Sequence, residues 1–316
     1  MPAITALICT YNRAYYLEKV LLSFEEQTLS KSEFEILLIN DGSDDDTADV
    51  VDKFKNRLPI RYFFHENMGL AASKNRGIEE AKAPIVVFVD DDDVATSQLL
   101  EEHLSIHKKY NEENYAVLGY TDLDEPMAND PLMKYVTTEG CELFSYPMLN
   151  DGDTLNYTYF WGGRSSCKVG FLKRYGVFDP VFTFGCEDIE LGYRLSLHGL
   201  KVVYHKSAKS CMLRSITIDD FFKRLMRQGM SQSVFAKLHH ADEIQRLCET
   251  VGAEEIWSDI KPVFDNLLSS ARNLDSIVRS RNDCGLDVDE LTMQLLYRAY
   301  GNAFKACKIK GIVEPQ

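Results

Sequence analysis

The chain has 316 residues, of which 45% are hydrophobic and 27% are charged, and its formal net charge is −14. This acidic balance disfavours nucleic acid and anionic lipid as general partners, because both carry dense negative charge. Met1–Thr10 lacks a basic n-region and no apolar run is long enough to span a membrane, so we expect a cytoplasmic chain without a signal peptide. Eight cysteines without CxxC spacing predict reduced thiols, and neither a disulfide framework nor a zinc site.

Short apolar segments alternate with helical ones in the first hundred residues. The expected strands are ITALIC (4–9), FEILLIN (34–40), IRYFF (60–64) and IVVFV (85–89), and the expected helices are Tyr15–Gln27, Asp44–Arg57 and Gly69–Ala81. Strand–helix–strand units at this spacing predict an α/β fold with a parallel sheet covered by helices.

Polar segments follow all four expected strands: TYNR (10–13), NDGSDDD (40–46), HENMG (65–69) and DDDD (90–93). Ligands of such sheets bind beyond the carboxyl ends of the strands, so these four segments predict a polar ligand site.

The remaining chain divides into two parts. Residues 120–160 show no clear periodicity and are expected to form loops, and order returns over 158–205. After about residue 216, the segments 218–238, 253–280 and 287–307 have apolar residues at three- and four-residue spacing. We therefore expect a helical C-terminal region.

Two aspartate runs have different interpretations. Ser43 is a candidate N-cap with Asp46 three residues later, so Asp44–Asp46 are expected in a first helical turn, where carboxylates are stabilising. Asp41 lies before the turn glycine, at the strand end itself, where it can accept a hydrogen bond from a ligand.

The run Asp90–Asp93 has no such local explanation, because the next helix is expected only from Thr96 or Ser97. Carboxylates this close repel one another, and a divalent cation such as Mg²⁺ or Mn²⁺ removes the penalty. Asp93 alone is open to interpretation as a capping residue. The run also fits the D-x-D-x-[TV] motif of haloacid-dehalogenase-type phosphatases with Asp90 as nucleophile, although three strand–helix units precede it here.

The motifs TYNR, INDGSDDDT, HENMGLAASKNRGI, FVDDDD and FTFGCEDIELGYRL occur in this order, and with them the chain resembles the family 2 glycosyltransferases over residues 1–215. The resemblance implies a GT-A fold, a mostly parallel Rossmann-like sheet flanked by helices. It divides the chain into a glycosyltransferase domain (1–215), with a nucleotide-binding half (1–119) and an acceptor-binding half (120–215), and a helical C-terminal extension (216–316).

The resemblance also assigns the donor site. Asp41 would bind the base, usually uracil, Asp90 and Asp91 would contact the ribose and the water shell of the metal, and Asp92 would ligate Mn²⁺ or Mg²⁺ directly. The implied nucleotide-sugar residues are Thr10, Tyr11, Arg13, Asp41, Asn67, Gly69, Lys74, Asn75, Asp90 and Asp91.

The same resemblance makes Asp188 the catalytic base, which would take a proton from the acceptor hydroxyl while Glu187 orients the acceptor. Trp161 and Gly162 in WGGRSS would line the sugar and acceptor pocket, although Trp161 also suits a core position. From the residues alone, we expect a helix from about Cys186 with Glu190 and Arg194 as a surface i,i+4 pair.

Two family features are missing. A histidine metal ligand often follows the strand after the E-D helix, but Cys211 or Met212 occupies that place, and His205 comes early and is interpreted as structural. The Q-x-x-R-W element of processive members is absent, which favours a non-processive enzyme.

The resulting hypothesis is a metal-dependent, inverting, non-processive glycosyltransferase. It would move a sugar from a nucleotide-diphospho-sugar, expected to be UDP-linked, to a hydroxyl of a glycan, lipid-linked or protein acceptor in glycan or polysaccharide biosynthesis. The alternatives are the phosphatase using Asp90 and a non-catalytic sugar-nucleotide-binding protein.

The helical region leaves further alternatives open. The amphipathic segment 219–238 carries basic residues, and it either docks on its own protein or lies peripherally on the inner face of a membrane that holds the acceptor. The remaining helices are candidates for a small bundle, an acceptor lid or a homodimer surface.

Overall fold

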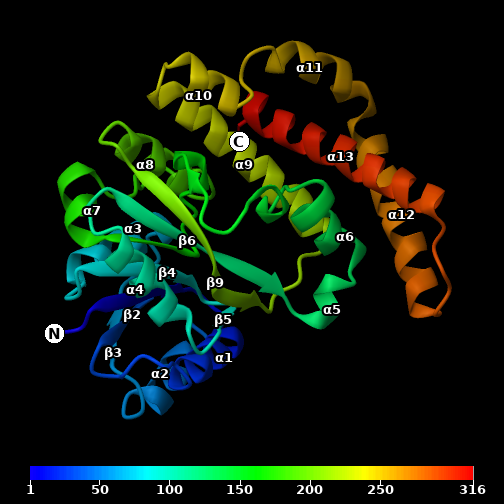
Figure 1. The fold of residues 1–316 in the computed structure, drawn as a ribbon. Helices are drawn as coiled ribbons and strands as arrows, with labels where there is room; N and C mark the ends of the chain where they lie inside the picture. The colour runs from blue at the N-terminus through cyan, green and yellow to red at the C-terminus, as the bar shows by residue number, and fades with distance from the viewer. Residues whose placement is uncertain (316) are drawn as a thin grey trace. The chain divides into compact units, whose positions relative to one another are not determined.

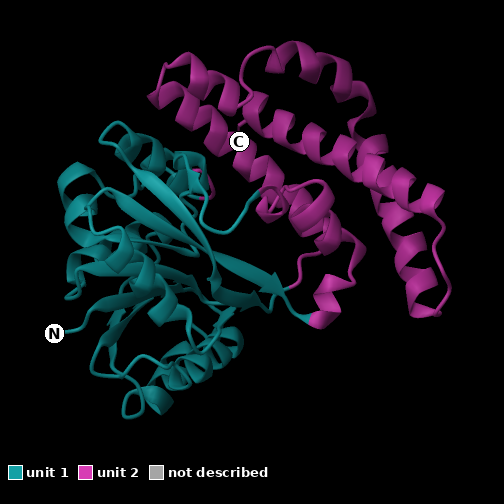
Figure 2. Cartoon of the chain, in the orientation of Figure 1, with its two compact units in different colours: residues 1–124, 149–183, 187–214 teal, residues 125–148, 184–186, 215–316 magenta. Residues whose placement is uncertain are grey.

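The computed structural model describes residues 1–315, whose contacts separate them into two units (Figure 2). Unit 1 consists of residues 1–124, 149–183 and 187–214, and unit 2 consists of 125–148, 184–186 and 215–316. Unit 2 therefore includes two segments from the part of the chain that was expected to bind the acceptor. The limits of 1–215 and 216–316 stay a prediction.

A nine-stranded sheet forms the centre of unit 1, in the order β3-β2-β1-β4-β8-β6-β9-β5 with β7 paired to β9 (Figure 1). The strands are β1 Ile4–Thr10, β2 Phe34–Asn40, β3 Ile60–Phe64, β4 Ile85–Asp90, β5 Asp93–Ala95, β6 Tyr115–Leu123, β7 Thr154–Leu155, β8 Ser165–Lys168 and β9 Lys201–Met212.

The first four strands are parallel, with β1 between β2 and β4 and β3 beside β2. The register pairs Thr10 with Asn40 and Cys9 with Asp90, so the polar segments after these strands meet at one edge of the sheet, as the sequence predicts. β8 is antiparallel to both β4 and β6, whereas β6 and β9 are parallel. The expected mostly parallel sheet is therefore confirmed, with some antiparallel strands.

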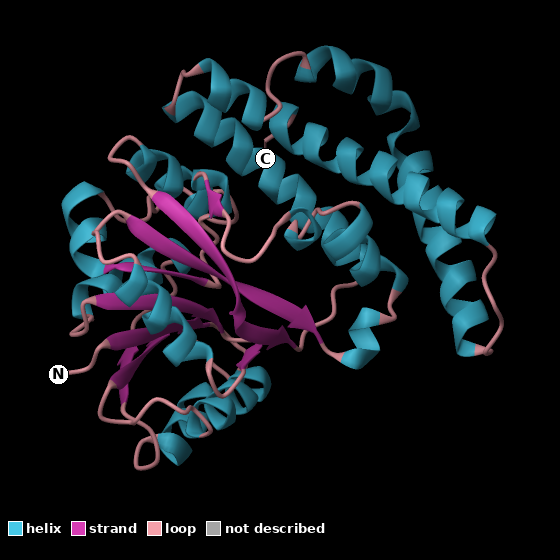
Figure 3. Cartoon of the chain, in the orientation of Figure 1, coloured by secondary structure: helices cyan, strands magenta, loops and turns pink. Residues whose placement is uncertain are grey.

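Helices cover this sheet in the strand–helix order that the sequence predicts (Figure 3). Those of unit 1 are α1 Ala14–Glu25, α2 Thr47–Phe54, α3 Leu70–Glu80, α4 Leu99–Lys109, α7 Val169–Tyr175, α8 Glu187–Ser196 and the short 3-10 helix η3 Tyr157–Tyr159.

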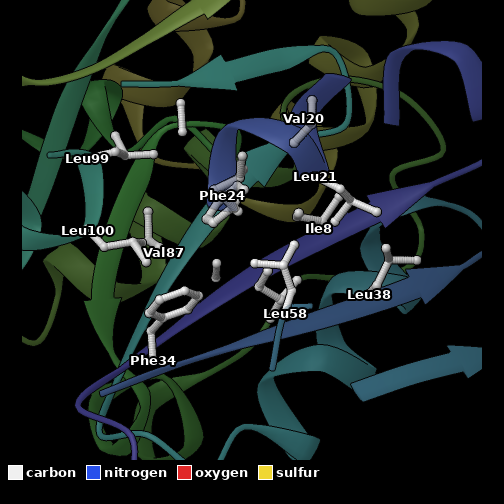
Figure 4. Packing of buried hydrophobic residues seen from close by; sticks show 14 of the residues in the cluster. Ile8, Val20, Leu21, Phe24, Phe34, Leu38, Leu58, Val87, Leu99 and Leu100 are labelled. Carbon is white, nitrogen blue, oxygen red and sulfur yellow. The ribbon is translucent and has the colours of Figure 1, made fainter. Parts of the chain in front are cut away.

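The main core of unit 1 lies between the sheet and α1, α2 and α4. Alternate side chains of β1, β2 and β4, such as Ile8, Leu38 and Val87, point towards Phe24 and Leu21 of α1 (Figure 4). The intervening strand residues are buried too, including Leu37 and Phe88. Burial of both faces explains why these strands read as continuous apolar runs.

The predicted start of α2 is wrong. The helix begins at Thr47, and Ser43 does not cap it but accepts a hydrogen bond from the main chain of Asn12. Asp45 accepts from the backbone amides of Thr47 and Ala14. Asp44 and Asp45 therefore join the loop after β2 to the chain at the start of α1, which is a long-range contact that the capping pattern cannot predict.

Two buried histidines of α4 share one serine hydroxyl. His103 Nδ1 and His107 Nε2 each lie 2.8 Å from Ser166 Oγ of β8. Burial lowers the pKa of both rings to about 3, with the neighbouring charges of His107 and Lys168 acting in the same direction. Both imidazoles are therefore neutral in the folded protein at ordinary pH.

Unit 2 is helical, as predicted for the C-terminal region (Figure 3). Its elements are α5 Glu125–Ala128, α6 Pro131–Lys134, the π-helix η1 Tyr135–Glu139, η2 Tyr146–Met148, α9 Ile218–Leu238, α10 Asp242–Leu247, α11 Ala253–Ile260, η4 Lys261–Val263, α12 Phe264–Asp283 and α13 Glu290–Val313. The segment expected as one helix over 253–280 is divided at Pro262, because proline cannot donate the hydrogen bond that a helix interior requires.

The apolar face of α9 packs on α13. Phe221 and Phe222 of α9 are buried and both contact the ring of Phe304. The helix thus docks on its own protein, and the alternative of a membrane contact through 219–238 has no support. Among residues 1–315, no helix combines the length and the apolar character needed to cross a membrane.

Glycines allow α9 and α13 to approach closely. A Cβ at Gly311 would lie 2.0 Å from the carbonyl oxygen of Met226, and a Cβ at Gly229 would lie 2.1 Å from that of Lys308. These obstacles are backbone atoms, which cannot move aside as a flexible side chain can.

We predict that Gly311→Ala destabilises the protein by at least about 2 kcal/mol, because the added methyl must push the two helices apart. Gly170→Ala in α7 is the matched control, since only Glu113 Oε1 lies within 4 Å of its added Cβ, at 3.6 Å. The control should be neutral or gain up to about 1 kcal/mol from helix propensity. Equal free energies of unfolding in urea for the two variants would contradict this packing.

The buried histidines predict a pH dependence of stability. Below pH 6.5 the unfolded chain protonates both rings and the folded chain does not, so stability falls with falling pH, by about 1 kcal/mol per pH unit and ring. A His103→Gln/His107→Gln variant lacks this effect and shares all other titrating groups. The stability difference between wild type and variant should therefore shrink by about 3 kcal/mol between pH 6.5 and pH 5, measured by urea unfolding. A constant difference would refute the assignment.

Candidate functional site

The aspartate run lies between two strands. Asp90 ends β4, and Asp93 begins β5 and is almost fully buried. Carboxylate oxygens of Asp90, Asp92 and Asp93 lie within 4.8 Å of one another. The interpretation of Asp93 as a helix cap is wrong, because α4 begins at Leu99 and Asp93 accepts hydrogen bonds from Thr121 and Ser210 instead.

Three guanidinium groups pair with these carboxylates. Arg13 Nη1 lies 2.6 Å from Asp91 Oδ1 and 3.3 Å from Asp92 Oδ2. Arg164 Nη2 lies 3.1 Å from Asp90 and 3.3 Å from Asp93, and Arg214 Nε lies 2.6 Å from Asp92 Oδ2. The charge that the sequence could not explain is thus partly balanced by arginines from three separate segments.

Burial controls the ionisation of this cluster. Burial raises the pKa of Asp91 to about 6, although the positive charge of Arg13 opposes the shift. Burial also raises the pKa of Asp93. Arg13 itself has a raised pKa, because Asp91 and Asp92 outweigh the effect of its burial. Burial therefore makes the charged forms of the Asp91 and Asp93 carboxylates less favourable than in water.

The residues present fit a divalent cation. Carboxylate oxygens are the ligands that Mg²⁺ and Mn²⁺ prefer, and Asp90, Asp92 and Asp93 converge. Asp93 Oδ1 is buried without a hydrogen-bond partner among residues 1–315. Gly163 allows the Asp90 carboxylate to approach the main chain closely, because a Cβ there would lie 2.1 Å from Asp90 Oδ2.

A second acidic pair begins α8. Glu187 is buried and its Oε1 lies 3.4 Å from Lys74 Nζ, which comes from α3 and is also buried. Burial lowers the pKa of Lys74, but attraction to Glu187, Asp188 and Asp90 outweighs it, so that the pKa is raised overall. Burial raises the pKa of Glu187, and Lys74 opposes that shift.

Asp188 is held by main-chain amides. Its Oδ2 accepts from the Gly162 amide at 2.9 Å and its Oδ1 accepts from the Ile189 amide at 2.8 Å. A Cβ at Gly162 would lie 2.6 Å from Lys74 Nζ. The adjacent glycines 162 and 163 thus approach Asp188 and Asp90, respectively.

The remaining donor-site residues lie in the loops after β1, β2 and β3. Asp41 is buried and accepts from the amides of Met68 and Gly69, which directly precede α3. Gly69 has φ +88°, which favours glycine. Asn67 is exposed and approaches Gly42, where a Cβ would lie 2.7 Å from the Asn67 amide nitrogen.

Thr10 and Tyr11 complete this edge. Thr10 is buried and its carbonyl accepts from the Asp41 amide, whereas Tyr11 is 49% exposed. Trp161 is half-buried and donates its Nε1–H to the carbonyl of Thr158. The ligand roles predicted for these residues stay predictions.

The side chain of Asn75 is hydrogen-bonded to the main chain of Phe178, and its predicted role at the nucleotide stays a prediction. Its side-chain amide donates to the carbonyl of Phe178 at 2.7 Å and its oxygen accepts from the Phe178 amide at 2.9 Å. Both polar atoms are therefore engaged in fixing the loop before α8. The Glu190–Arg194 pair is not the expected surface pair, because Glu190 is buried and Arg194 also donates to the carbonyl of Val177.

Sequence reasoning missed Arg164 and Arg214. Arg164 lies within the WGGRSS motif, so its place beside the proposed sugar pocket could have indicated a role in the site. Arg214 follows the segment 202–213, in which only a histidine ligand was expected. His205 pairs with Glu102 at 2.6 Å and stands outside the carboxylate cluster, in keeping with a structural role. Met212 is buried at the end of β9.

Comparison with known proteins gives a family. The model of the family Glycosyl transferase family 2 matches residues 5–175, which is more than half of the chain. Validoxylamine A glucosyltransferase of Streptomyces hygroscopicus subsp. jinggangensis is 30% identical over 231 residues, covering 66% of this chain and 54% of that protein.

A second relative is the GalNAc(5)-diNAcBac-PP-undecaprenol beta-1,3-glucosyltransferase of Campylobacter jejuni. It is 35% identical over 145 residues, which cover 45% of this chain and 44% of that protein. The chain spans about half the length of the curated relatives that it matches.

Solved structures support the fold. The mannosyltransferase PcManGT from Pyrobaculum calidifontis, solved with GDP-Man and Mn²⁺, has a TM-score of 0.62 at 15% identity, covering 100% of this chain and 88% of that chain. Residues 1–349 of S. aureus TarS have a TM-score of 0.58 at 16% identity, covering 98% and 89%. The chain therefore has the predicted GT-A-like fold.

The buried Lys74–Glu187 pair gives a test of the site's assembly. We predict that Lys74→Met destabilises the protein by about 3–5 kcal/mol, because it leaves Glu187 buried without its cation. Adding Glu187→Gln to Lys74→Met should restore roughly half of that loss. The exposed Lys82→Met is the control and should change stability by less than about 0.5 kcal/mol. If the double variant is no more stable than Lys74→Met in urea unfolding, the pair does not hold these elements together.

Proposed function

Because the chain belongs to glycosyl transferase family 2, we propose that it transfers a sugar from a nucleotide-diphospho-sugar, UDP-linked by preference, to an acceptor hydroxyl. The observation that supports this proposal most directly is that two adjacent glycines approach the proposed base and the carboxylate cluster: Gly162 donates to Asp188, and Gly163 approaches Asp90. A base and a metal-binding cluster near one turn suit a single displacement at a sugar carbon.

Asp188 is the proposed base. The amides of Gly162 and Ile189 fix its carboxylate, and each oxygen retains a lone pair that an acceptor hydroxyl can use. As Asp188 takes the proton, the acceptor oxygen would attack the anomeric carbon from the face opposite the diphosphate. The new glycosidic bond forms while the bond to the leaving diphosphate breaks, and this displacement inverts the anomeric centre. Glu187, held by Lys74, borders the same space and would orient the acceptor.

Asp90, Asp92 and Asp93 would hold the divalent cation, with Asp92 as its principal ligand. When bound, Mg²⁺ or Mn²⁺ supplies Lewis-acid neutralisation of the diphosphate. Arg13 and Lys74 add fixed positive charge to this edge of the sheet. The loop fixed by Asp41 would receive the base of the nucleotide.

The acceptor belongs to the proposal as a class only. The Campylobacter relative is named for a lipid-linked acceptor and the Streptomyces relative for validoxylamine A. The acceptor hydroxyl therefore belongs to a glycan, a lipid-linked saccharide or a protein, and the proposal does not choose among them. Transfer is proposed to be non-processive, because the Q-x-x-R-W element is missing. The phosphatase alternative loses its basis, because family membership accounts for the motif around Asp90.

We predict that Asp92→Asn and Asp188→Asn fail in different ways. UDP with Mn²⁺ should stabilise the wild type against heat, by about 2.7 kcal/mol at a hundredfold excess over the dissociation constant. Asp92→Asn should lose this metal-dependent shift. Asp188→Asn should keep it and lose at least about a hundredfold in UDP release from the UDP-sugar.

The screen covers several UDP-sugars and one GDP-sugar, each with and without Mn²⁺. Asp219→Asn in α9 serves as control, since that exposed carboxylate pairs with Arg272 and takes no part in the cluster. Near-normal UDP release by Asp188→Asn would reject the base assignment. Absence of a shift with every nucleotide would reject the donor class.

A further inference from the structure

Arg214 pairs with Asp92, the proposed principal ligand of the metal. The family resemblance leads one to seek a histidine ligand after β9, but Met212 ends that strand and is buried. Two residues later, Arg214 Nε lies 2.6 Å from Asp92 Oδ2, the shortest contact of a cation to that carboxylate. Asp92, the proposed principal ligand of the metal, is thus already paired with a cationic side chain.

The main chain fixes this contact. β5 and β9 pair antiparallel with Asp93 opposite Met212, and the Leu213 amide donates to the carbonyl of Asp92 at 2.9 Å. A main-chain hydrogen bond therefore joins residue 92 to residue 213, which directly precedes Arg214 in the sequence. The pair does not depend on two long side chains meeting at the surface, unlike most exposed ion pairs.

The contact also differs energetically from a surface pair. The Asp92 side chain is only 6% exposed and that of Arg214 is 34% exposed, so the guanidinium covers a buried carboxylate from the solvent side. A buried carboxylate that loses its cation is strongly destabilised. A divalent ion that binds Asp92 must therefore displace Arg214 or accept it as a positive neighbour, and both effects weaken metal binding.

We infer that Arg214 competes with the divalent cation for Asp92 and lowers the affinity of the nucleotide-free protein for metal. The inference rests on the proposed metal site and deepens it by naming the residue that sets its affinity. Arg13 contributes less to this competition, because it is shared with Asp91 and its contact to Asp92 is longer, at 3.3 Å. Arg214 is accordingly a positioning residue for Asp92 and does not itself act on the sugar.

The test measures Mn²⁺ binding to the full chain without nucleotide, by the loss of the electron paramagnetic resonance signal of free Mn²⁺. Arg214→Gln should bind Mn²⁺ about tenfold more tightly than the wild type, because one like charge beside the ion is gone. Arg214→Lys keeps the charge and should stay near the wild-type affinity. Arg174→Gln removes an exposed guanidinium paired with Glu113 and controls for the change in net charge.

The outcomes separate the two proposals. If Arg214→Gln binds Mn²⁺ no more tightly than the wild type or Arg174→Gln, while Asp92→Asn loses binding, the role of Arg214 is refuted and the metal site stands. Equal tightening by Arg214→Lys and Arg214→Gln would also refute it, since charge would not be the cause. If wild type, Arg214→Gln and Asp92→Asn all fail to bind, the proposed metal site itself is wrong.

Discussion

Charge balance at the carboxyl edge of the sheet is the constraint on which the site depends. Asp91, Asp92 and Asp93 are each at most 5% exposed, and carboxylates in that position need positive partners. The partners come from three places in the chain: Arg13 before α1, Arg164 before β8 and Arg214 after β9. The sheet order brings these segments together, so the fold and the electrostatics of the site cannot be separated.

The sequence predicts the first part of this arrangement because its information is local. Apolar runs buried on both faces identify the parallel strands, and the residues after them must meet at one edge. The helix expected over 218–238 occurs with those bounds, since its apolar spacing and the Thr217 cap are local signals too. The α/β class and the location of Asp90–Asp93 follow from the same patterns.

The rest depends on contacts between distant residues. Asp93 reads as a cap, but pairing of β5 with β9 places it in a strand, 117 residues from its partner Ser210. The amide of Asn75 could bind a polar ligand. Only the fold shows that this amide donates a hydrogen bond to the carbonyl of Phe178, 103 residues away. Arg214 has no local pattern that relates it to Asp92. No spacing within one segment encodes such a pair.

The three residues that precede α8 have contacts within unit 2. Residues 184–186 belong to unit 2, where Ser231 Oγ of α9 donates to the Phe184 carbonyl at 2.6 Å and Arg227 lies over the Phe184 ring at 4.2 Å from its centre. Cys186 has φ +64°, a conformation that is unfavourable for a side chain with a Cβ and persists only where neighbours impose it.

The next residues along the chain are Glu187 and Asp188. Cys186 is thus the last residue before the first turn of α8, which carries both acids, and its unfavourable backbone conformation lies directly before Glu187. Within unit 1, the amides of Gly162 and Ile189 fix the carboxylate of the proposed base, and Lys74 fixes its neighbour Glu187. The geometry of Asp188 therefore depends on the turn before β8 and on the first turn of α8, two segments that no local pattern relates to each other.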